Sequence, residues 1–228
     1  MKKRTTFTIT AIILSLTIVG CASGNKTDST KTKNAFEQTV ESYLNEGKGY
    51  MPEDSPSFLS EENKELFLNA DYIYFNFSVC GGFDLIDYEK GEFVDIDKNG
   101  TTYRYYKTDY DYVDFVDYIK SVFTDDLADK LINGGDFYID IDGKLCCMDG
   151  ARGSDISYTG KKYELISETK DEIDFKAIAK HSWAGVYENE QQYRDEGNTD
   201  PFEWEEEYTF KIVKTDNGFR IAEFEYWK

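Results

Sequence analysis

Histidine, proline and cysteine are scarce in this sequence. Its 228 residues include one histidine, three prolines and four cysteines. The single histidine, His181, excludes zinc sites built from several histidines and mechanisms that need two of them. The sequence also has no phosphate-binding glycine loop, no dinucleotide-binding glycine fingerprint and no basic patch interleaved with aromatic residues. It therefore predicts neither a nucleotide cofactor nor a nucleic-acid partner.

Positively charged residues are also few compared with negatively charged ones. The 26 lysine and arginine residues are outnumbered by 45 aspartate and glutamate residues, which gives a formal net charge of −19. Such a chain repels nucleic acid and anionic lipid and favours cationic partners or metal ions. The alternative is that the acidic surface is simply solvated and binds no partner. The 18 tyrosines, 16 phenylalanines and three tryptophans supply enough large apolar side chains for a buried core. The length allows one domain, or two at most.

The first 21 residues have the pattern of a bacterial lipoprotein leader. Basic residues open it, an apolar stretch runs from Phe7 to Gly20, and Cys21 follows directly. We predict that residues 1–20 are a signal peptide and that lipidated Cys21 anchors the protein to the outer face of the cell membrane. The apolar stretch is short beside the roughly 20 residues of a spanning helix, and a retained signal anchor is the alternative. The small polar residues 21–34 predict a flexible tether.

Three cysteines remain if Cys21 carries the lipid, and three cannot all pair within one chain. Cys146 and Cys147 are neighbours on a predicted strand, so their side chains point to opposite faces and at most one of them can face Cys80. We interpret these cysteines first as small buried apolar residues and second as members of a disulfide.

Two helices are predicted at the start of the domain. Apolar residues from Phe36 to Leu44 recur at helical spacing, which predicts a short amphipathic helix. Ser60 is a suitable N-cap for a second helix that ends at the glycine pair after Cys80. The segment 71–77 could instead form a strand, because it is rich in aromatic residues.

The remaining pattern predicts strands interrupted by two more helices. Asp111 and Thr124 are suitable N-caps for these helices, and the chain after Gly135 is predicted to be all β. Hairpin turns are expected at Asn99-Gly100 and Asn217-Gly218. The predicted strands cover residues 83–88, 92–96, 101–107, 136–141, 144–148, 162–168, 172–186, 203–214 and 219–227. The fold class is therefore α+β, with N-terminal helices packed on a largely antiparallel, curved β-sheet in a single domain over residues 35–228.

Residues 95–100 match the first half of a calcium-binding loop. Alternating carboxylates at Asp95 and Asp97 fit this pattern, but the twelfth position is Tyr106, where the loop needs a bidentate glutamate. The same segment is explained by a hairpin turn. We therefore expect no metal here.

Nucleophilic catalysis by a cysteine would have to use His181 as its base. No recognisable nucleophile turn surrounds Cys80, Cys146 or Cys147, and the strand-like segment 176–185 around His181 is more typical of a packed histidine. A pair of carboxylates for glycoside hydrolysis cannot be identified from the sequence, because 45 acidic residues form many such pairs by chance. We predict that the protein is not an enzyme.

A polar segment between two predicted strands is the most distinctive candidate site. It is too long for a tight turn, and loops on rigid sheets commonly carry recognition, although an uninvolved surface loop is the alternative. The segment consists of Asp149, Gly150, Ala151, Arg152, Gly153, Ser154 and Asp155.

Several segments follow one another in a characteristic order. A strand with Tyr103-Arg104-Tyr105 leads into the helix that ends at Phe123-Thr124, and the turn at 142–145 and the closing strand 217–227 come later. On these segments, residues 65–228 resemble the IseA family of DL-endopeptidase inhibitors. The resemblance implies an α+β domain on Gram-positive surfaces that inhibits NlpC/P60-type cysteine peptidases, which trim peptidoglycan stem peptides. It also implies that an extended loop, Asp149–Asp155 in this chain, blocks the cleft of the enzyme.

Two functions remain open on the sequence. The first is a lipid-anchored inhibitor of cell-wall DL-endopeptidases that needs no cofactor, because inhibition requires no chemistry from the inhibitor. An acidic protein would be drawn to a more basic cleft. The second is an extracytoplasmic lipoprotein that binds a small ligand or peptide in an apolar pocket, lined by aromatic residues such as Tyr72, Tyr74, Phe77 and Trp183.

Overall fold

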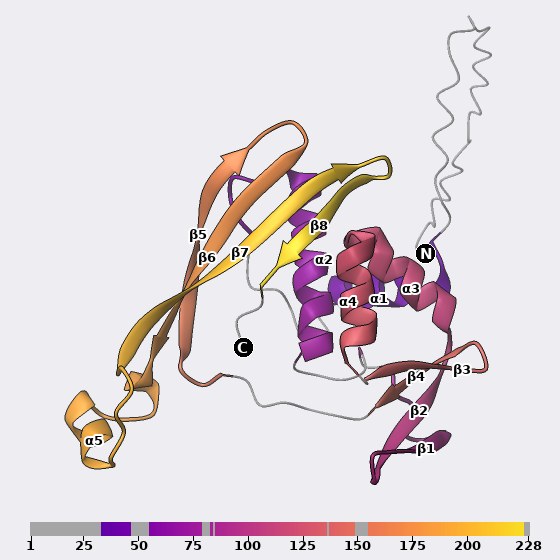
Figure 1. The fold of residues 1–228 in the computed structure, drawn as a ribbon, viewed down its shortest axis with the longest axis horizontal. Helices are drawn as coiled ribbons and strands as arrows, with labels where there is room; N and C mark the ends of the chain where they lie inside the picture. The colour runs from indigo at the N-terminus through magenta and orange to yellow at the C-terminus, as the bar shows by residue number, and fades with distance from the viewer. Residues whose placement is uncertain are drawn as a thin grey trace, which may run out of the picture. The chain divides into compact units, whose positions relative to one another are not determined.

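A computed structural model describes residues 33–46, 55–78, 83, 85–135, 137–148 and 155–225. Helices dominate the first half of this part of the chain, and strands dominate the second (Figure 1). In chain order the elements are α1 (Ala35–Glu46), α2 (Glu61–Ser78), β1 (Phe93–Lys98), β2 (Thr101–Asp111), α3 (Tyr112–Val122), α4 (Asp125–Gly134), β3 (Tyr138–Ile141), β4 (Lys144–Met148), β5 (Tyr158–Glu168), β6 (Glu172–Ser182), the 3₁₀ turn η1 (Trp183–Gly185), α5 (Glu190–Asp195), β7 (Glu203–Thr215) and β8 (Gly218–Phe224).

The strands form two antiparallel sheets of four strands each. The first sheet has the order β1-β2-β4-β3, so β2 pairs with β4 although α3, α4 and β3 separate them in the sequence. In the second sheet, β5-β6-β7-β8, every strand pairs with its neighbour in the sequence, and the long strands curve together (Figure 1). The α+β class and the antiparallel pairing are confirmed.

Side-chain caps start the first two helices. The Asn34 carboxamide oxygen accepts a hydrogen bond from the backbone N–H of Glu37 at 2.8 Å, so the last residue of the predicted tether is the cap of α1. The Ser60 hydroxyl oxygen accepts from the backbone N–H of Asn63 at 3.3 Å and caps α2, as expected. Ile73 is fully buried on α2, and the strand alternative for 71–77 is wrong.

Helices α3 and α4 begin where predicted, but their caps differ. Asp111 and Thr124 occupy the N-cap positions, and neither side chain makes a capping hydrogen bond. The Asp111 carboxylate instead accepts a hydrogen bond from the Lys144 ammonium at 2.7 Å. Asp111 therefore links the start of α3 to β4.

Both predicted hairpins form. Asn99 (φ 52°) and Gly100 (φ 82°) are left-handed, as a two-residue turn between β1 and β2 requires. In the last hairpin Thr215 pairs with Gly218, so the turn residues are 216–217, one position earlier than predicted. Gly218 itself begins β8 with a φ of 96°.

The strand predicted at 83–88 is wrong. Of its described residues, 85–87 have no regular structure and Tyr88 begins a turn. The Asp87 carboxylate accepts hydrogen bonds from the backbone N–H groups of Glu89 and Lys90, at 3.0 and 3.2 Å. These local bonds satisfy the backbone without a neighbouring strand.

The prediction that the chain after Gly135 is all β is also wrong. Strand β6 ends at Ser182, where the side-chain oxygen accepts from the backbone N–H of Ala184 at 3.1 Å and starts η1. Helix α5 follows, capped by Asn189. Both hydrogen bonds are local and override the strand-like composition of the segment.

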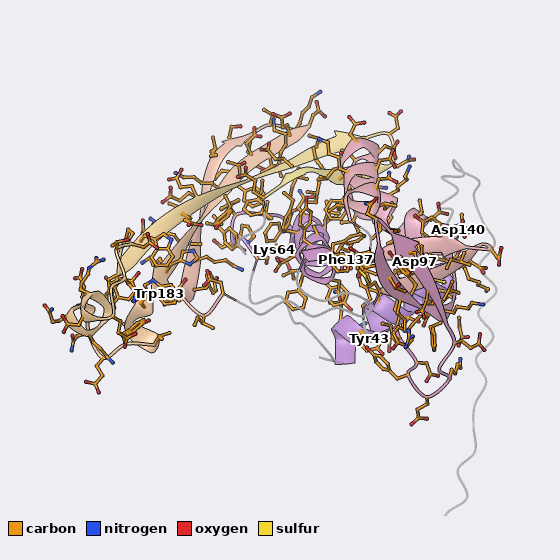
Figure 2. The ribbon with its side chains drawn as sticks, turned by 60° about the horizontal axis from the view of Figure 1, so that its bottom comes forward. Tyr43, Lys64, Asp97, Phe137, Asp140 and Trp183 are labelled. Carbon is orange, nitrogen blue, oxygen red and sulfur yellow. The ribbon has the colours of Figure 1, made fainter. Side chains whose placement is uncertain are left out.

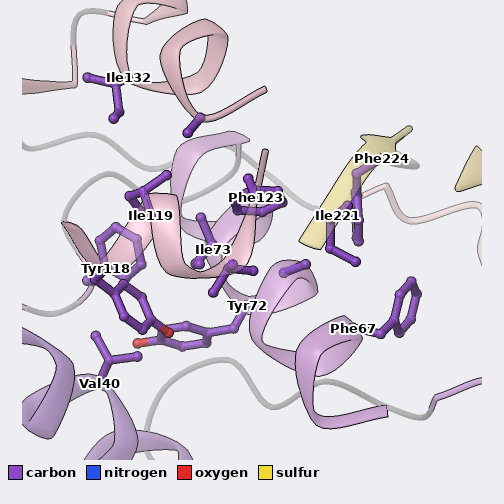
Figure 3. Packing of buried hydrophobic residues seen from close by; sticks show 14 of the residues in the cluster. Val40, Phe67, Tyr72, Ile73, Tyr118, Ile119, Phe123, Ile132, Ile221 and Phe224 are labelled. Carbon is purple, nitrogen blue, oxygen red and sulfur yellow. The ribbon is translucent and has the colours of Figure 1, made fainter. Parts of the chain in front are cut away.

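Phe67 lies at the centre of the contact between the helices and the second sheet. Its ring centroid is 5.4 to 5.6 Å from those of Tyr163, Phe175, Phe210 and Phe224, and the side chain is fully buried. Figure 3 shows Phe67 on its helix facing the strand that carries Ile221 and Phe224. This aromatic cluster fixes α2 on the concave face of the second sheet.

Candidate functional site

The predicted loop Asp149–Asp155 joins the two sheets. Residues 149–154 lie outside the described residues, whereas both ends of the loop are described. Met148 ends β4 in the first sheet, and Asp155 lies just before β5 in the second. Within the described strands, β1–β4 all belong to the first sheet and β5–β8 to the second, so the chain passes from one sheet to the other at this segment.

The N-terminal end of the loop leaves an interior strand. β4 lies between β2 and β3, and Met148 is paired with Tyr105 of β2. The backbone N–H of Met148 also donates to the carbonyl oxygen of Phe137 at 2.8 Å. The preceding residue, Cys147, is fully buried. Pairing on both sides makes this end rigid.

The C-terminal end of the loop is held through the Asp155 carboxylate. Oδ1 accepts hydrogen bonds from the backbone N–H of Ser157 at 2.8 Å and from its hydroxyl at 2.6 Å. Oδ2 lies 3.1 Å from Nδ1 of His181 on β6. The Ser157 carbonyl in turn accepts from the backbone N–H of Ser182 at 2.7 Å. We call Asp155, Ser157 and His181 the loop anchor.

His181 is almost completely enclosed, with 4 % of its surface exposed. Its ring stacks on Trp204 of β7, with centroids 4.8 Å apart and planes 11° from parallel. The Trp204 indole N–H donates to a Glu206 carboxylate oxygen at 3.0 Å, which fixes the stacking partner. Among the described residues, His181 Nε2 has no hydrogen-bond partner.

Two carboxylates near this histidine are held in their charged form. Burial acts to raise the pKa of Asp155, but the hydrogen bonds from Ser157 and the charge of His181 outweigh it, so the pKa lies below its ordinary value. The pKa of Glu206 is lowered mainly by hydrogen bonds from the Tyr208 hydroxyl and the Trp204 indole. Both groups are therefore anionic at neutral pH.

Asp155→Asn is expected to destabilise the protein in a pH-dependent way. Because the folded pKa of Asp155 is depressed, its carboxylate stabilises the fold above its unfolded pKa of roughly 3.9, and this contribution is lost as the pH falls through the folded value. We expect the variant to lose about 1 kcal/mol of unfolding free energy near neutral pH, and little at an acidic pH at which this carboxyl group is protonated in both the folded and the unfolded state. Urea unfolding at both pH values measures the difference.

Asp95→Asn is the matched control for this prediction. It also removes a carboxylate from an ion pair, with Arg104, but that pair is exposed and belongs to the first sheet. We expect its urea midpoint to stay close to that of the wild type. An Asp155→Asn effect of equal size at both pH values would show that the carboxylate charge is not what stabilises the anchor.

The loop anchor does not have the geometry of a catalytic triad. In a triad, the serine and the carboxylate bind opposite nitrogens of the imidazole. Here Ser157 Oγ and Asp155 Oδ2 both lie 3.1 Å from Nδ1 of His181. The Ser157 side chain is also buried and cannot reach a substrate. The arrangement fits a structural anchor.

The structure does not bring the cysteines to His181. Cys146 and Cys147 are on β4 of the first sheet, whereas His181 is on β6 of the second. Both thiols are free and buried, and burial raises the pKa of each. Their interpretation as small buried apolar residues is confirmed, while Cys80 lies outside the described residues.

The aromatic residues proposed for a ligand pocket are packed against other side chains. Tyr72 is 3 % exposed, and the Tyr74 ring stacks on Phe224 at 4.4 Å. Phe77 packs against the same core, and Trp183 belongs to a separate aromatic cluster beside α5 (Figure 2). The ligand-binding alternative therefore loses the feature that suggested it.

The calcium-like segment is a hairpin. The Asp95 carboxylate accepts two hydrogen bonds from Arg104, at 2.8 and 3.0 Å, and Asp97 accepts one from the Thr102 hydroxyl. Asp97 lies on the first sheet (Figure 2). No group of histidine, cysteine or acidic residues within the described ranges is arranged to hold a metal ion.

One protein-family model matches most of the chain. The model of the IseA DL-endopeptidase inhibitor matches residues 54–225, a range that includes α2, both sheets and the segment between β4 and β5. The chain belongs to the IseA DL-endopeptidase inhibitor family. The resemblance drawn from the sequence is therefore confirmed, and IseA membership implies inhibition of a DL-endopeptidase as function and such an enzyme as partner. Curated proteins show no match to the chain.

The N-terminal predictions lie outside the part of the chain that the structure describes. This applies to the signal peptide at 1–20, to Cys21 and to the tether as far as residue 32. Within the described residues, no helix is long and apolar enough to cross a membrane. Lipidation of Cys21 remains a prediction.

Sequence reasoning missed most of the loop anchor. The spacing of Asp155 and Ser157 is typical of an Asx turn and was a usable local signal. The contribution of His181 depends on the β5–β6 pairing, in which it lies opposite Tyr158. The contact of Trp204 with His181 depends on the register between β6 and β7, in which the two residues lie opposite each other. Neither register can be read from local sequence.

Proposed function

We propose that this protein is a lipid-anchored, extracytoplasmic inhibitor of NlpC/P60-type DL-endopeptidases, and that the loop Asp149–Asp155 enters the enzyme cleft. The family match over residues 54–225 carries the proposal, because it assigns inhibition of a DL-endopeptidase. The finer points rest on other features. The leader that ends at Cys21 supports a lipid anchor, and the place of the loop between two sheets supports its role as the contact.

Preorganisation supports the loop as the inhibitory contact. Binding a flexible segment costs conformational entropy, and holding its ends in place reduces that cost. One end of this loop leaves the paired Met148, and the other is fixed by the Asp155 carboxylate. A substrate-excluding contact of this kind needs no catalytic group, which agrees with the arrangement of Ser157 and His181.

Charge supports the choice of partner. The net charge of −19 becomes more negative when residues 1–20 are removed, since they contain three basic residues and no acidic one. A strongly anionic protein associates faster with a basic cleft and is repelled by the anionic polymers around it. The proposed partner is therefore an endopeptidase whose cleft is positively charged.

Mixing the purified full-length chain with an NlpC/P60 endopeptidase tests the proposal. We expect cleavage of peptidoglycan stem peptides to fall in proportion to the added protein, and to stop near one equivalent when binding is tight. Release of cleaved peptides, followed by chromatography, measures the remaining activity.

A muramidase acting on the same peptidoglycan is the control. Its activity should not change, because it cuts glycan strands and has no DL-endopeptidase cleft. Equal loss of both activities would mean that the protein covers the substrate and does not bind the enzyme. Undiminished cleavage by several NlpC/P60 enzymes would refute the proposed partner.

A further inference from the structure

β5 lies at one end of the second sheet, where it pairs with β6 along one of its two edges (Figure 1). It has 11 residues, whereas the other described strands at the ends of the sheets, β1, β3 and β8, have 6, 4 and 7. The junction of α3 and α4 covers part of the β8 edge, because the backbone N–H of Thr124 donates to the Ile221 carbonyl. β5 therefore presents the longest edge to which another strand could be added.

The second half of this strand is exposed. All five residues from Glu164 to Glu168 are exposed, and two of them are large and apolar. The exposed fraction is 43 % for Leu165 and 59 % for Ile166. Consecutive exposed apolar residues on a long edge strand are typical of a strand that pairs with another chain.

The charges of β5 indicate which chain that is. Lys161 and Lys162 lie in its first half and Glu164 and Glu168 in its second, so the strand has no net charge in a chain of net charge −19. Lys162 and Glu164 share one face, and their charged atoms lie 3.1 Å apart. A strand that is basic in one half and acidic in the other complements a copy of itself that runs in the opposite direction. The partner that fits this edge is therefore a second copy of the chain.

Symmetry limits how two copies of β5 can pair. Antiparallel copies in one continuous sheet are related by a two-fold axis perpendicular to the sheet, and side chains opposite each other lie on the same face. The axis therefore passes through a residue that faces its own copy. An axis at Lys161, Lys162 or Glu164 places like charges opposite each other, which is unfavourable. An axis at Tyr163 places Lys162 of each copy opposite Glu164 of the other.

The regular part of β5 also favours an axis at Tyr163. Pairing with β6 is regular from Gly160 to Leu165 and is shifted on either side, at 158–160 and at 165–167. An axis at Gly160 or at Leu165 would extend half of the contact beyond the regular part. With the axis at Tyr163, Ile166 comes close to Gly160 of the other copy, where an added Cβ would meet nothing within 4 Å. The apolar side chain therefore has room there.

We propose that the protein forms a two-fold dimer through β5, in which the second sheets of two copies join into one antiparallel sheet centred on Tyr163. Each copy uses its β5 edge once, so the pair is closed and does not extend into a fibre. The contact includes about seven residues from each copy, fewer than the roughly 20 to 30 of a standard interface, and the dimer is therefore weak and depends on concentration. The proposal goes beyond inhibition, because the endopeptidase takes no part in it.

Sedimentation of the full-length chain at low salt, from micromolar to millimolar concentration, tests the dimer. Lys162→Glu places glutamates opposite glutamates in a dimer of identical chains, and Glu164→Lys places lysines opposite lysines. We expect each variant alone to raise the dissociation constant of the dimer roughly tenfold. An equal mixture of the two variants places each new glutamate opposite a new lysine. The mixed dimer should therefore regain the dissociation constant of the wild type.

Lys130→Glu and Glu89→Lys are the matched controls. They make the same changes of charge at exposed residues outside β5. Each should leave the dissociation constant unchanged, and mixing them should have no effect. Association through residues 1–20 is the same in every variant and does not alter these ratios. Urea unfolding of each variant checks that it is folded.

Amide hydrogen exchange gives a second readout. In the wild type, we expect the protection of amides in residues 160–166 to increase with protein concentration, because pairing of the two edges adds backbone hydrogen bonds there. Lys162→Glu should show less protection at the same concentration. The amides of β7, which pairs on both sides within its own sheet, should not depend on concentration.

Each contrary outcome overturns a defined part of the proposal. A chain that remains monomeric at every concentration overturns the dimer, and a dimer that neither variant weakens places the contact outside β5. Two weakened variants without recovery in the mixture overturn the axis at Tyr163. Protection of residues 160–166 that appears only when an endopeptidase is added assigns this edge to the enzyme and overturns the second copy as its partner. Inhibition by a monomer leaves the proposed function intact.

Discussion

Replacing residues 149–154 by a glycine-serine sequence of the same length is expected to abolish inhibition, with at least about a hundredfold loss of affinity. The replacement removes every side chain of the proposed contact that precedes Asp155 and increases the entropy lost on binding. Equal length matters because this segment connects the two sheets, so a shortened loop could strain β4 and β5. Titration of an NlpC/P60 endopeptidase with the variant measures the loss.

The turn at Asp216 and Asn217 provides a matched control for the loop replacement. Both residues are exposed, and they lie at the far end of the β7–β8 hairpin from Trp204 and the loop anchor. Replacing both with glycine should leave inhibition unchanged. Full inhibition by the loop variant would place the contact elsewhere on the molecule. Unchanged unfolding by urea would show that a loss of inhibition does not come from loss of the fold.

Phe67→Ala is expected to cost about 3 to 5 kcal/mol of unfolding free energy. The side chain is fully buried and packs against four aromatic rings of the second sheet, so its removal leaves a cavity that rigid neighbours cannot fill. For a chain of this size, such a loss lowers the midpoint of thermal unfolding by roughly 10 °C. Calorimetry and urea unfolding both measure it.

Ile166→Ala is the control for Phe67→Ala. Ile166 lies on β5 of the same sheet, but 59 % of it is exposed, so little apolar area is lost on truncation. A thermal midpoint close to that of the wild type is expected. If Phe67→Ala also left the midpoint unchanged, the aromatic cluster would not be what holds α2 on the sheet.

Local patterns predicted much of the fold. The apolar spacing between Phe36 and Leu44 identified α1, and the Ser60 cap identified the start of α2. The glycine at position 100 marked a hairpin correctly. These features depend on residues close together in the chain, where spacing and turn chemistry are sufficient.

The parts of the fold that could not be predicted depend on contacts between residues far apart in the sequence. The division into two sheets depends on β2 pairing with β4 across two intervening helices, and no local pattern specifies that contact. Asp111 was expected to cap α3 but binds Lys144, its neighbour only in the folded sheet. The position of the segment between two strands was predicted from its composition, whereas the contact of Asp155 with His181 depends on the pairing of β5 with β6.

The segment 149–154, which connects the two sheets, also determines what cleavage by a protease would do to the protein. One cut in the segment 149–154 would divide the chain into a portion that carries the first sheet and a portion that carries the second. The two portions share an interface, since Phe67 packs into the second sheet and the backbone N–H of Thr124 donates to the carbonyl of Ile221 at 2.9 Å. We therefore expect the two fragments of a cut molecule to stay associated.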